Sequence, residues 1–284
     1  MAQLIQMRQR IKAIETIKKV THAMRLISMS LHSRLRVKTP LLKNYNNEIS
    51  NIFKKLRRIA PEWTSPITHP QAPEESNPLF VLVGSQKGLC GTFNTALIKE
   101  FERIMPTQEL KKTQFITVGK KAVDYLEKQN VKETIKQFDE ITARNFTAVS
   151  NEIVNIIVNA QTPYSSVKIL SNELKTFFLQ KPRLFQLIPI ADDTIQEEGQ
   201  DLKSEYMWYQ EAHDLLDKIA PQYIASNINA VLLESILAEQ AARFISMDTA
   251  TRNAKNLLEE TTLQYNKLRQ AKITKELTEL ATNF

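Results

Sequence analysis

The sequence predicts an α/β fold combined with a coiled coil: long N- and C-terminal helices, paired antiparallel, on either side of a central Rossmann-like α/β domain. No Gly or Pro precedes Pro40 and none follows Pro221, so both ends can form long helices. Between them, short apolar runs alternate with amphipathic stretches. The predicted divisions are residues 1–58 (N-terminal coiled-coil helix), 59–78 (proline-rich linker), 79–205 (α/β domain) and 206–284 (C-terminal coiled-coil helix).

The predicted C-terminal helix, residues 222–280, is too long for a compact globule. At 1.5 Å per residue it would extend roughly 90 Å, whereas a globule of 284 residues has a radius of gyration of roughly 19 Å. We therefore expect a projecting rod with a partner along its side, although membership of a helical bundle stays open for this segment alone.

One face of this helix carries mainly small residues, which let a second helix approach closely. The expected inward stripe is Ala250, Ala254, Leu257, Thr261, Leu268 and Ala271. A second row near the end is Leu263, Ile273, Leu277 and Leu280.

The N-terminal helix shows apolar residues in steps of three and four, a spacing typical of coiled coils. The predicted seam is Leu4, Met7, Ile11, Ile14, Ile17, Val20, Met24, Ile27, Leu31 and Leu35. The pattern resumes after Pro40, so we expect one long helix, bent near that proline.

Positive charge is concentrated in the N-terminal segment. Residues 1–58 hold 14 Lys and Arg against Glu15 and Glu48, a net charge of +12, whereas the whole chain carries +7. The remainder therefore sums to −5. This asymmetry indicates an acidic partner: nucleic acid, anionic lipid or an acidic protein surface.

Composition excludes several classes of protein. The single Cys90 leaves no internal disulfide and no multi-cysteine metal site. No apolar run reaches the ~18 residues of a membrane span, and the first residues lack the apolar core of a signal peptide. We expect a soluble or peripheral protein without direct membrane insertion.

The middle segment predicts strands at residues 79–83, 115–118, 167–170 and 185–190, with helices at 94–104, 120–129 and 147–160. A largely parallel sheet follows from this alternation. Five prolines between Pro61 and Pro78 indicate a polar, extended linker, and residues 192–201 form an acidic loop.

The loop at residues 84–91 lies between a strand and a helix, where phosphates are often bound. Its glycine spacing matches neither the dinucleotide motif nor the phosphate loop. We interpret Gly88, Cys90 and Gly91 as a structural turn, with Cys90 as a buried apolar residue. The four histidines are scattered, so we expect no catalytic residue, no metal site and no cofactor.

Three blocks carry a family resemblance. Residues 17–24 read IKKVTHAM, residues 87–94 read KGLCGTFN, and the last helix carries ES at 234, AEQAAR at 238, MD at 247 and YNKLRQAKIT at 265. In this order, on a helix–α/β–helix layout, they resemble the gamma subunit of F-type ATP synthases over nearly the whole length. Departures from the family pattern lie at Gln86, Lys87, Thr92, Met29, Leu31, Tyr209, Gln210 and the C-terminal tail.

The resemblance implies a non-catalytic rotor shaft that couples rotation of a membrane ring to ATP synthesis. It implies that the paired helices enter a ring of alpha and beta subunits. It further implies that the α/β domain contacts the epsilon subunit and the membrane c ring, at the cytoplasmic face of a bacterial plasma (inner) membrane, with no nucleic acid.

Specific residues follow from the same resemblance. Arg269, Gln270 and Thr274 match a catch that hydrogen-bonds an acidic loop of one beta subunit. The basic face of the first helix, with Lys18, Lys19 and Arg25, is expected to point toward beta-subunit loops. Two other classes stay open: a basic coiled-coil protein that binds nucleic acid, and an enzyme that holds a nucleotide at residues 84–91.

Overall fold

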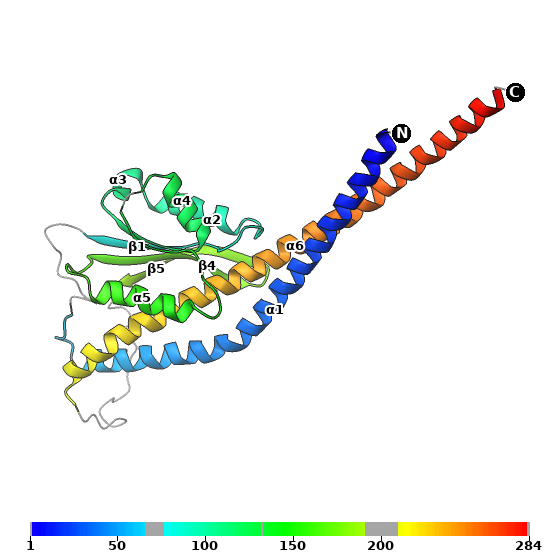
Figure 1. The fold of residues 1–284 in the computed structure, drawn as a ribbon. Coiled ribbons are helices and arrows are strands. Elements are labelled where there is room, and N and C mark those ends of the chain that lie inside the picture. Colours follow the sequence, from blue (N-terminus) through cyan, green and yellow to red (C-terminus); the bar gives the residue numbers. More distant parts are fainter. Residues whose placement is uncertain (1, 66–76, 132, 191–209, 283–284) are drawn as a thin grey trace. The chain divides into compact units, whose positions relative to one another are not determined.

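A computed structural model describes residues 2–65, 77–131, 133–190 and 210–282 (Figure 1). Helix α1 spans Ala2–Ile59 and helix α6 spans Ala212–Thr282. The chain divides into two compact units, residues 1–30 with 243–284 and residues 31–242, and both long helices run through each. The acidic loop at 192–201, the linker residues 66–76, Tyr209 and the last two residues of the tail lie outside the described residues.

The unit of residues 31–242 contains a five-stranded mixed sheet in the order β3-β2-β1-β4-β5. The strands are β1 (Pro78–Val83), β2 (Gln114–Val118), β3 (Thr134–Phe138), β4 (Ser166–Thr176) and β5 (Leu179–Ile188). Neighbours are parallel except β4 and β5, which form an antiparallel pair. The order 3-2-1-4 of the parallel strands is that of a Rossmann-like half, which confirms the predicted fold class.

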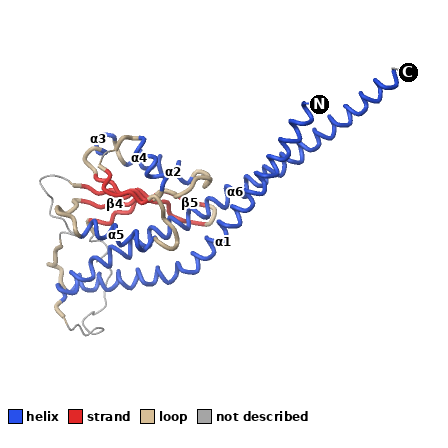
Figure 2. Tube along the Cα trace, in the orientation of Figure 1, coloured by secondary structure: helices blue, strands red, loops and turns tan. Residues whose placement is uncertain are grey.

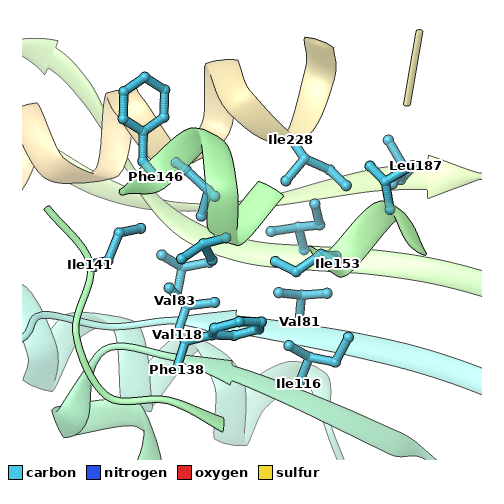
Figure 3. Close-up of a cluster of buried hydrophobic side chains, with 14 of the residues drawn as sticks. Val81, Val83, Ile116, Val118, Phe138, Ile141, Phe146, Ile153, Leu187 and Ile228 are labelled. Atoms are coloured by element: carbon cyan, nitrogen blue, oxygen red, sulfur yellow. The ribbon is translucent and has the colours of Figure 1, made fainter. Parts of the chain in front are cut away.

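Helices cover both faces of this sheet (Figure 2). On β1 the side chains alternate: Leu79, Val81 and Val83 pack against α5 (Phe146–Val158) and α6, as Figure 3 shows for Val81 and Val83. Phe80 and Leu82 instead pack against α2 (Phe93–Ile104) and α4 (Lys120–Lys128). A short helix, α3 (Thr107–Leu110), precedes β2. Burial on both faces explains why β1 is a continuous apolar run.

Two strands differ from the sequence-based prediction. Strand β3 was not predicted, because it lies at the edge of the sheet and only Phe138 among its residues is buried. The predicted strand at 185–190 corresponds to β5, which starts earlier, at Leu179, and pairs antiparallel with β4. Its exposed, charged first half hides the strand from a search for apolar runs.

Both long helices continue through a proline. Helix α1 contains Pro40, and α6 contains Pro221 and begins ten residues before the predicted start at 222. A proline removes one backbone hydrogen bond from a helix interior. Tertiary packing offsets that loss in α6, since Leu216 and Ala220 are buried in a cluster with Phe53 and Leu56 of α1.

The first part of the predicted linker is packed rather than extended and polar. Ala60 and Trp63 are 2% and 3% exposed and join the cluster formed by α1 and α6. The Trp63 Nε1 atom donates a hydrogen bond to Asp217 Oδ1 of α6 at 2.9 Å. This contact ties the end of α1 to the start of α6.

Candidate functional site

In the unit of residues 1–30 and 243–284, α1 and α6 run antiparallel. Arg25 Nη1 donates to Asp248 Oδ1 at 2.6 Å, and Thr251 Oγ1 donates to Thr21 Oγ1 at 2.9 Å. Nearer the N-terminus, a groove is lined by residues of both helices: Gln3, Gln6, Met7, Arg10, Gln264, Lys267 and Leu268. Residue numbers fall along α1 as they rise along α6, which confirms the predicted antiparallel pair.

The seam of α1 is predicted correctly at its first four positions, and again at Met24, which is half-buried, and at Leu35, which is 2% exposed. Leu4, Met7, Ile11 and Ile14 are buried or half-buried. At the other predicted positions between residues 17 and 31, the buried row lies one residue later. The predicted Ile17, Val20 and Ile27 are 54%, 52% and 59% exposed, and the buried or half-buried positions are Lys18, Thr21, Arg25 and Ser28.

The physical reason for this shift is that α1 carries two parallel rows with the same three-and-four spacing. One row is apolar and the other is polar, so counting hydrophobic residues selects the apolar row. The polar row can face α6 because α6 presents Asp248 and Thr251, which pair with Arg25 and Thr21. Ser28, with a small side chain that is 1% exposed, permits close packing of the two helices.

A polar cluster joins α1 and α6 at residues 22–25 and 248–252. Asp248 accepts hydrogen bonds from Arg25 and, one turn along α6, from Arg252. His22 Nδ1 lies 3.3 Å from Arg25 Nη2. The hydrogen bond from Arg25 is the main cause of a pKa of Asp248 below the ordinary carboxyl value, and Arg252 lowers this pKa further. The sequence-based prediction did not include Asp248 and Arg252 in a site, although Asp248 belongs to the MD pair at residues 247–248, one of the segments that carry the family resemblance.

The predicted stripe on α6 is partly correct. Ala254 and Thr261 are buried, and Ala250 and Leu268 are half-buried. Leu257 is 41% exposed, because the seam passes through its neighbour Leu258. Ala271 and the whole second row are exposed: Leu263, Ile273, Leu277 and Leu280.

The last turns of α6 extend past the start of α1, as the labelled ends in Figure 1 show. Arg269, Gln270 and Thr274 follow Leu268, which still lines the groove with α1, and all three are exposed. Thr274 Oγ1 donates to the Gln270 carbonyl oxygen at 3.1 Å, so the helix aligns these two residues on one face. The apolar Ile273 and Leu277 beside them are 48% and 62% exposed.

The three basic residues expected on one face of α1 have different environments. Lys19 is exposed and Lys18 is half-buried. Arg25 is bound to Asp248 of the same chain, so it is not available to a partner in the way predicted. Of the three residues, only Lys19 is therefore fully exposed, while Lys18 is half-buried in the seam row and Arg25 is paired with Asp248.

The loop at residues 84–91 is closed by its own hydrogen bonds. Asn94 Oδ1 accepts from the Ser85 backbone amide at 3.1 Å, while its Nδ2 donates to Ser85 Oγ at 2.8 Å. Gly91 has a positive φ of 59°, a conformation that glycine adopts readily. Cys90 is 2% exposed and packs against Ala238 of α6. These bonds favour the interpretation as a structural turn.

Elsewhere the described ranges contain no group of three or more His, Cys, Asp or Glu side chains placed to ligate a metal. No helix within the same ranges is both long enough and apolar enough to span a bilayer.

Comparisons with known proteins agree with one another. The family model described as ATP synthase matches residues 3–284. The ATP synthase gamma chain of Salinibacter ruber is 30% identical over 303 residues, covering 99% of this chain and 97% of that protein. That of Geobacter metallireducens is 29% identical over 286 residues, with 99% and 97% covered. A chain in the Euglena gracilis mitochondrial ATP synthase (OSCP/F1/c-ring) has a TM-score of 0.68 at 17% identity, with 99% and 93% covered.

Proposed function

This chain belongs to the ATP synthase gamma-chain family, and on that premise we propose that it is the central rotor shaft of an F-type ATP synthase. The observation that carries the proposal is the antiparallel helix pair that ends in a single projecting α6. A shaft that turns inside a ring needs a surface with few strong, directional bonds. Exposed apolar and neutral polar side chains on both helices meet that need.

The proposed partners are the alpha and beta subunits around the helix pair, and the epsilon subunit and membrane c ring at the α/β unit. The chain itself would be non-catalytic, with nucleotide chemistry on the surrounding subunits. Its place would be the cytoplasmic face of a bacterial inner membrane, held there by the complex. The comparisons give no support to the alternative of a nucleic-acid-binding protein.

Two contact regions are proposed on the shaft. Arg269, Gln270 and Thr274, exposed near the end of α6, would hydrogen-bond an acidic loop of a beta subunit. Lys18 and Lys19 would face acidic loops from α1. Because exposed ion pairs contribute only ~0.2–1 kcal/mol each, single lysine changes should have small effects on coupling.

The test is purification of the tagged chain from native membranes, followed by identification of the co-purifying subunits. We expect alpha and beta subunits and an ATPase activity that depends on them. The purified chain alone should bind no ATP at micromolar concentration. Absence of alpha and beta subunits from the complex, or micromolar ATP binding by the chain alone, would contradict the proposal.

A further inference from the structure

An exposed apolar ridge runs along α1 in the unit of residues 31–242. It consists of Val37, Leu41 and Tyr45, which are 76%, 71% and 54% exposed. Their spacing of four residues aligns them on one helix face. A single exposed apolar residue is ordinary, but a contiguous apolar patch on a protein surface marks an interaction site.

A groove opens beside the ridge, between α1, α5 and α6. Its volume is about 360 Å³, and Leu42, Tyr45, Thr147, Asn151, Gln222 and Asn229 line it. Ser226, at its wall, donates to Asn46 Oδ1 at 2.7 Å. Asn229 Oδ1 is buried and accepts no hydrogen bond from any residue that the structure describes. The residues that line the groove are therefore uncharged and partly apolar.

Positive charge accompanies the ridge. Arg34 and Lys38 are exposed and lie four residues apart on the same side of α1. Neither forms an ion pair with another residue in the described ranges. An apolar strip with two free cations beside it is complementary to an apolar strip flanked by carboxylates.

We propose that the ridge and the groove together dock an amphipathic helix of a partner subunit whose apolar stripe is flanked by acidic residues. The ridge spans nine residues, whose eight steps of 1.5 Å give a length of roughly 12 Å, which suits two to three turns of such a helix. Its carboxylates would pair with Arg34 and Lys38, and a neutral side chain would enter the groove. The inference rests on the proposed function, because the partner is taken to be another subunit of the same assembly.

The first experiment measures whether the assembled complex covers the ridge. The native Cys90 is 2% exposed, so Leu41→Cys adds one readily accessible thiol. We expect maleimide to label Leu41→Cys at least about tenfold more slowly in the complex than in the free chain. Ile135→Cys, 43% exposed on β3 at the sheet edge, serves as the matched control and should react at similar rates in both.

The outcomes of labelling separate the two proposals. If alpha and beta subunits co-purify but Leu41→Cys reacts as fast in the complex as in the free chain, the docking proposal is wrong and the shaft assignment stands. If Leu41→Cys is already protected in the free monomer, the chain covers its own ridge and docking is also overturned. Loss of alpha and beta subunits from the preparation would count against the shaft assignment itself.

A second experiment identifies the occupant. Replacing Tyr45 with photoreactive p-benzoylphenylalanine in the complex should give a cross-link to a partner peptide with acidic residues flanking an apolar stripe. The reversal Arg34→Glu/Lys38→Glu should lower the yield of that cross-link about tenfold. The control Lys111→Glu/Lys112→Glu makes the same change of charge at exposed positions elsewhere and should leave the yield unchanged.

The membrane is the competing occupant, because basic and apolar residues also bind anionic lipid. The free chain should bind phosphatidylglycerol vesicles no more tightly than its Leu41→Asp variant. Vesicle binding that Leu41→Asp abolishes, or a cross-link from position 45 to lipid or to a basic peptide, would overturn the proposal.

Discussion

Arg25 and Asp248, 223 positions apart in the chain, form an ion pair of 2.6 Å that joins the two long helices. Their side chains are only 27% and 16% exposed. An arginine thus occupies a position where a coiled coil usually places an apolar residue. The pair favours one register of α1 against α6, because a shift by one residue would separate the two charges.

The coupling between these two residues is measurable. In a double-mutant cycle with Arg25→Ala and Asp248→Ala, we expect an interaction of about 1 kcal/mol, since the pair is charged but partly hydrated. Urea unfolding of the isolated chain provides the four free energies. Lys19→Ala, an exposed change on the same helix, should show no coupling with Asp248→Ala.

The same coupling should depend on pH in one direction. The pKa of Asp248 is lowered in the folded chain, chiefly by the hydrogen bond from Arg25, so the pair stabilises the fold above the unfolded carboxyl value of ~3.9. This contribution is lost as pH falls below that value and through the lowered folded pKa. The cycle repeated at pH 7, 5 and 3 should give equal coupling at the first two values and less at pH 3. Coupling that persisted undiminished well below the folded pKa would contradict the charge-based account.

Because the buried row of α1 passes through Ser28 and not through Ile27, substitutions at these two neighbours should differ in their effect on stability. Ser28→Leu should destabilise the isolated chain by roughly 1–3 kcal/mol, because it adds volume at a site that is 1% exposed. Ile27→Ser should change stability by less than about 0.5 kcal/mol, since Ile27 is 59% exposed. Chemical denaturation of both variants is the measurement. If Ile27→Ser destabilised the chain more than Ser28→Leu does, the seam predicted from hydrophobicity alone would be the correct one.

Gly119 lies where its own loop approaches the backbone of Gly84 and Ser85 closely. Its φ is 89°, and a Cβ there would lie 2.3 Å from the Gly84 carbonyl oxygen. Gly119→Ala should therefore destabilise the α/β unit by roughly 1–3 kcal/mol or more. Gly88→Ala is the matched control: no atom lies within 4 Å of its Cβ position and its φ is not in the left-handed region, so thermal unfolding should be nearly unchanged.

The proposed catch at the end of α6 concerns activity rather than folding. Gln270→Leu or Arg269→Ala should lower ATP turnover and synthesis severalfold in complexes that still assemble, because hydrogen bonds to charged groups contribute roughly 1.5–3 kcal/mol. Truncation after Leu268 should reduce turnover at least as much, since it also removes exposed apolar residues such as Ile273 and Leu277. Full turnover in both point variants would refute the catch while leaving the shaft assignment intact.

Local sequence patterns were sufficient to predict the strands that are buried on both faces and the helices that are amphipathic along their length. Strands β1 and β2 and helices α2, α4 and α5 were predicted within a few residues, because their apolar side chains repeat at the period of the element. Strand β3, with Lys136 and Gln137 exposed at the sheet edge, has no such repeat. Its existence depends on parallel pairing with β2, which no local pattern records.

The sequence by itself indicated most elements of the α/β unit, a long helix at each end of the chain and the concentration of positive charge near the N-terminus. These properties depend on composition and on spacing between neighbouring residues. Only the tertiary structure decided which of two equally spaced rows on α1 forms the seam, and whether Arg25 faces a partner or Asp248. That choice depends on the polar groups that α6 presents across the pair. Polar side chains from distant segments gain the free energy of pairing only when they are in contact, so it cannot be read from either segment alone.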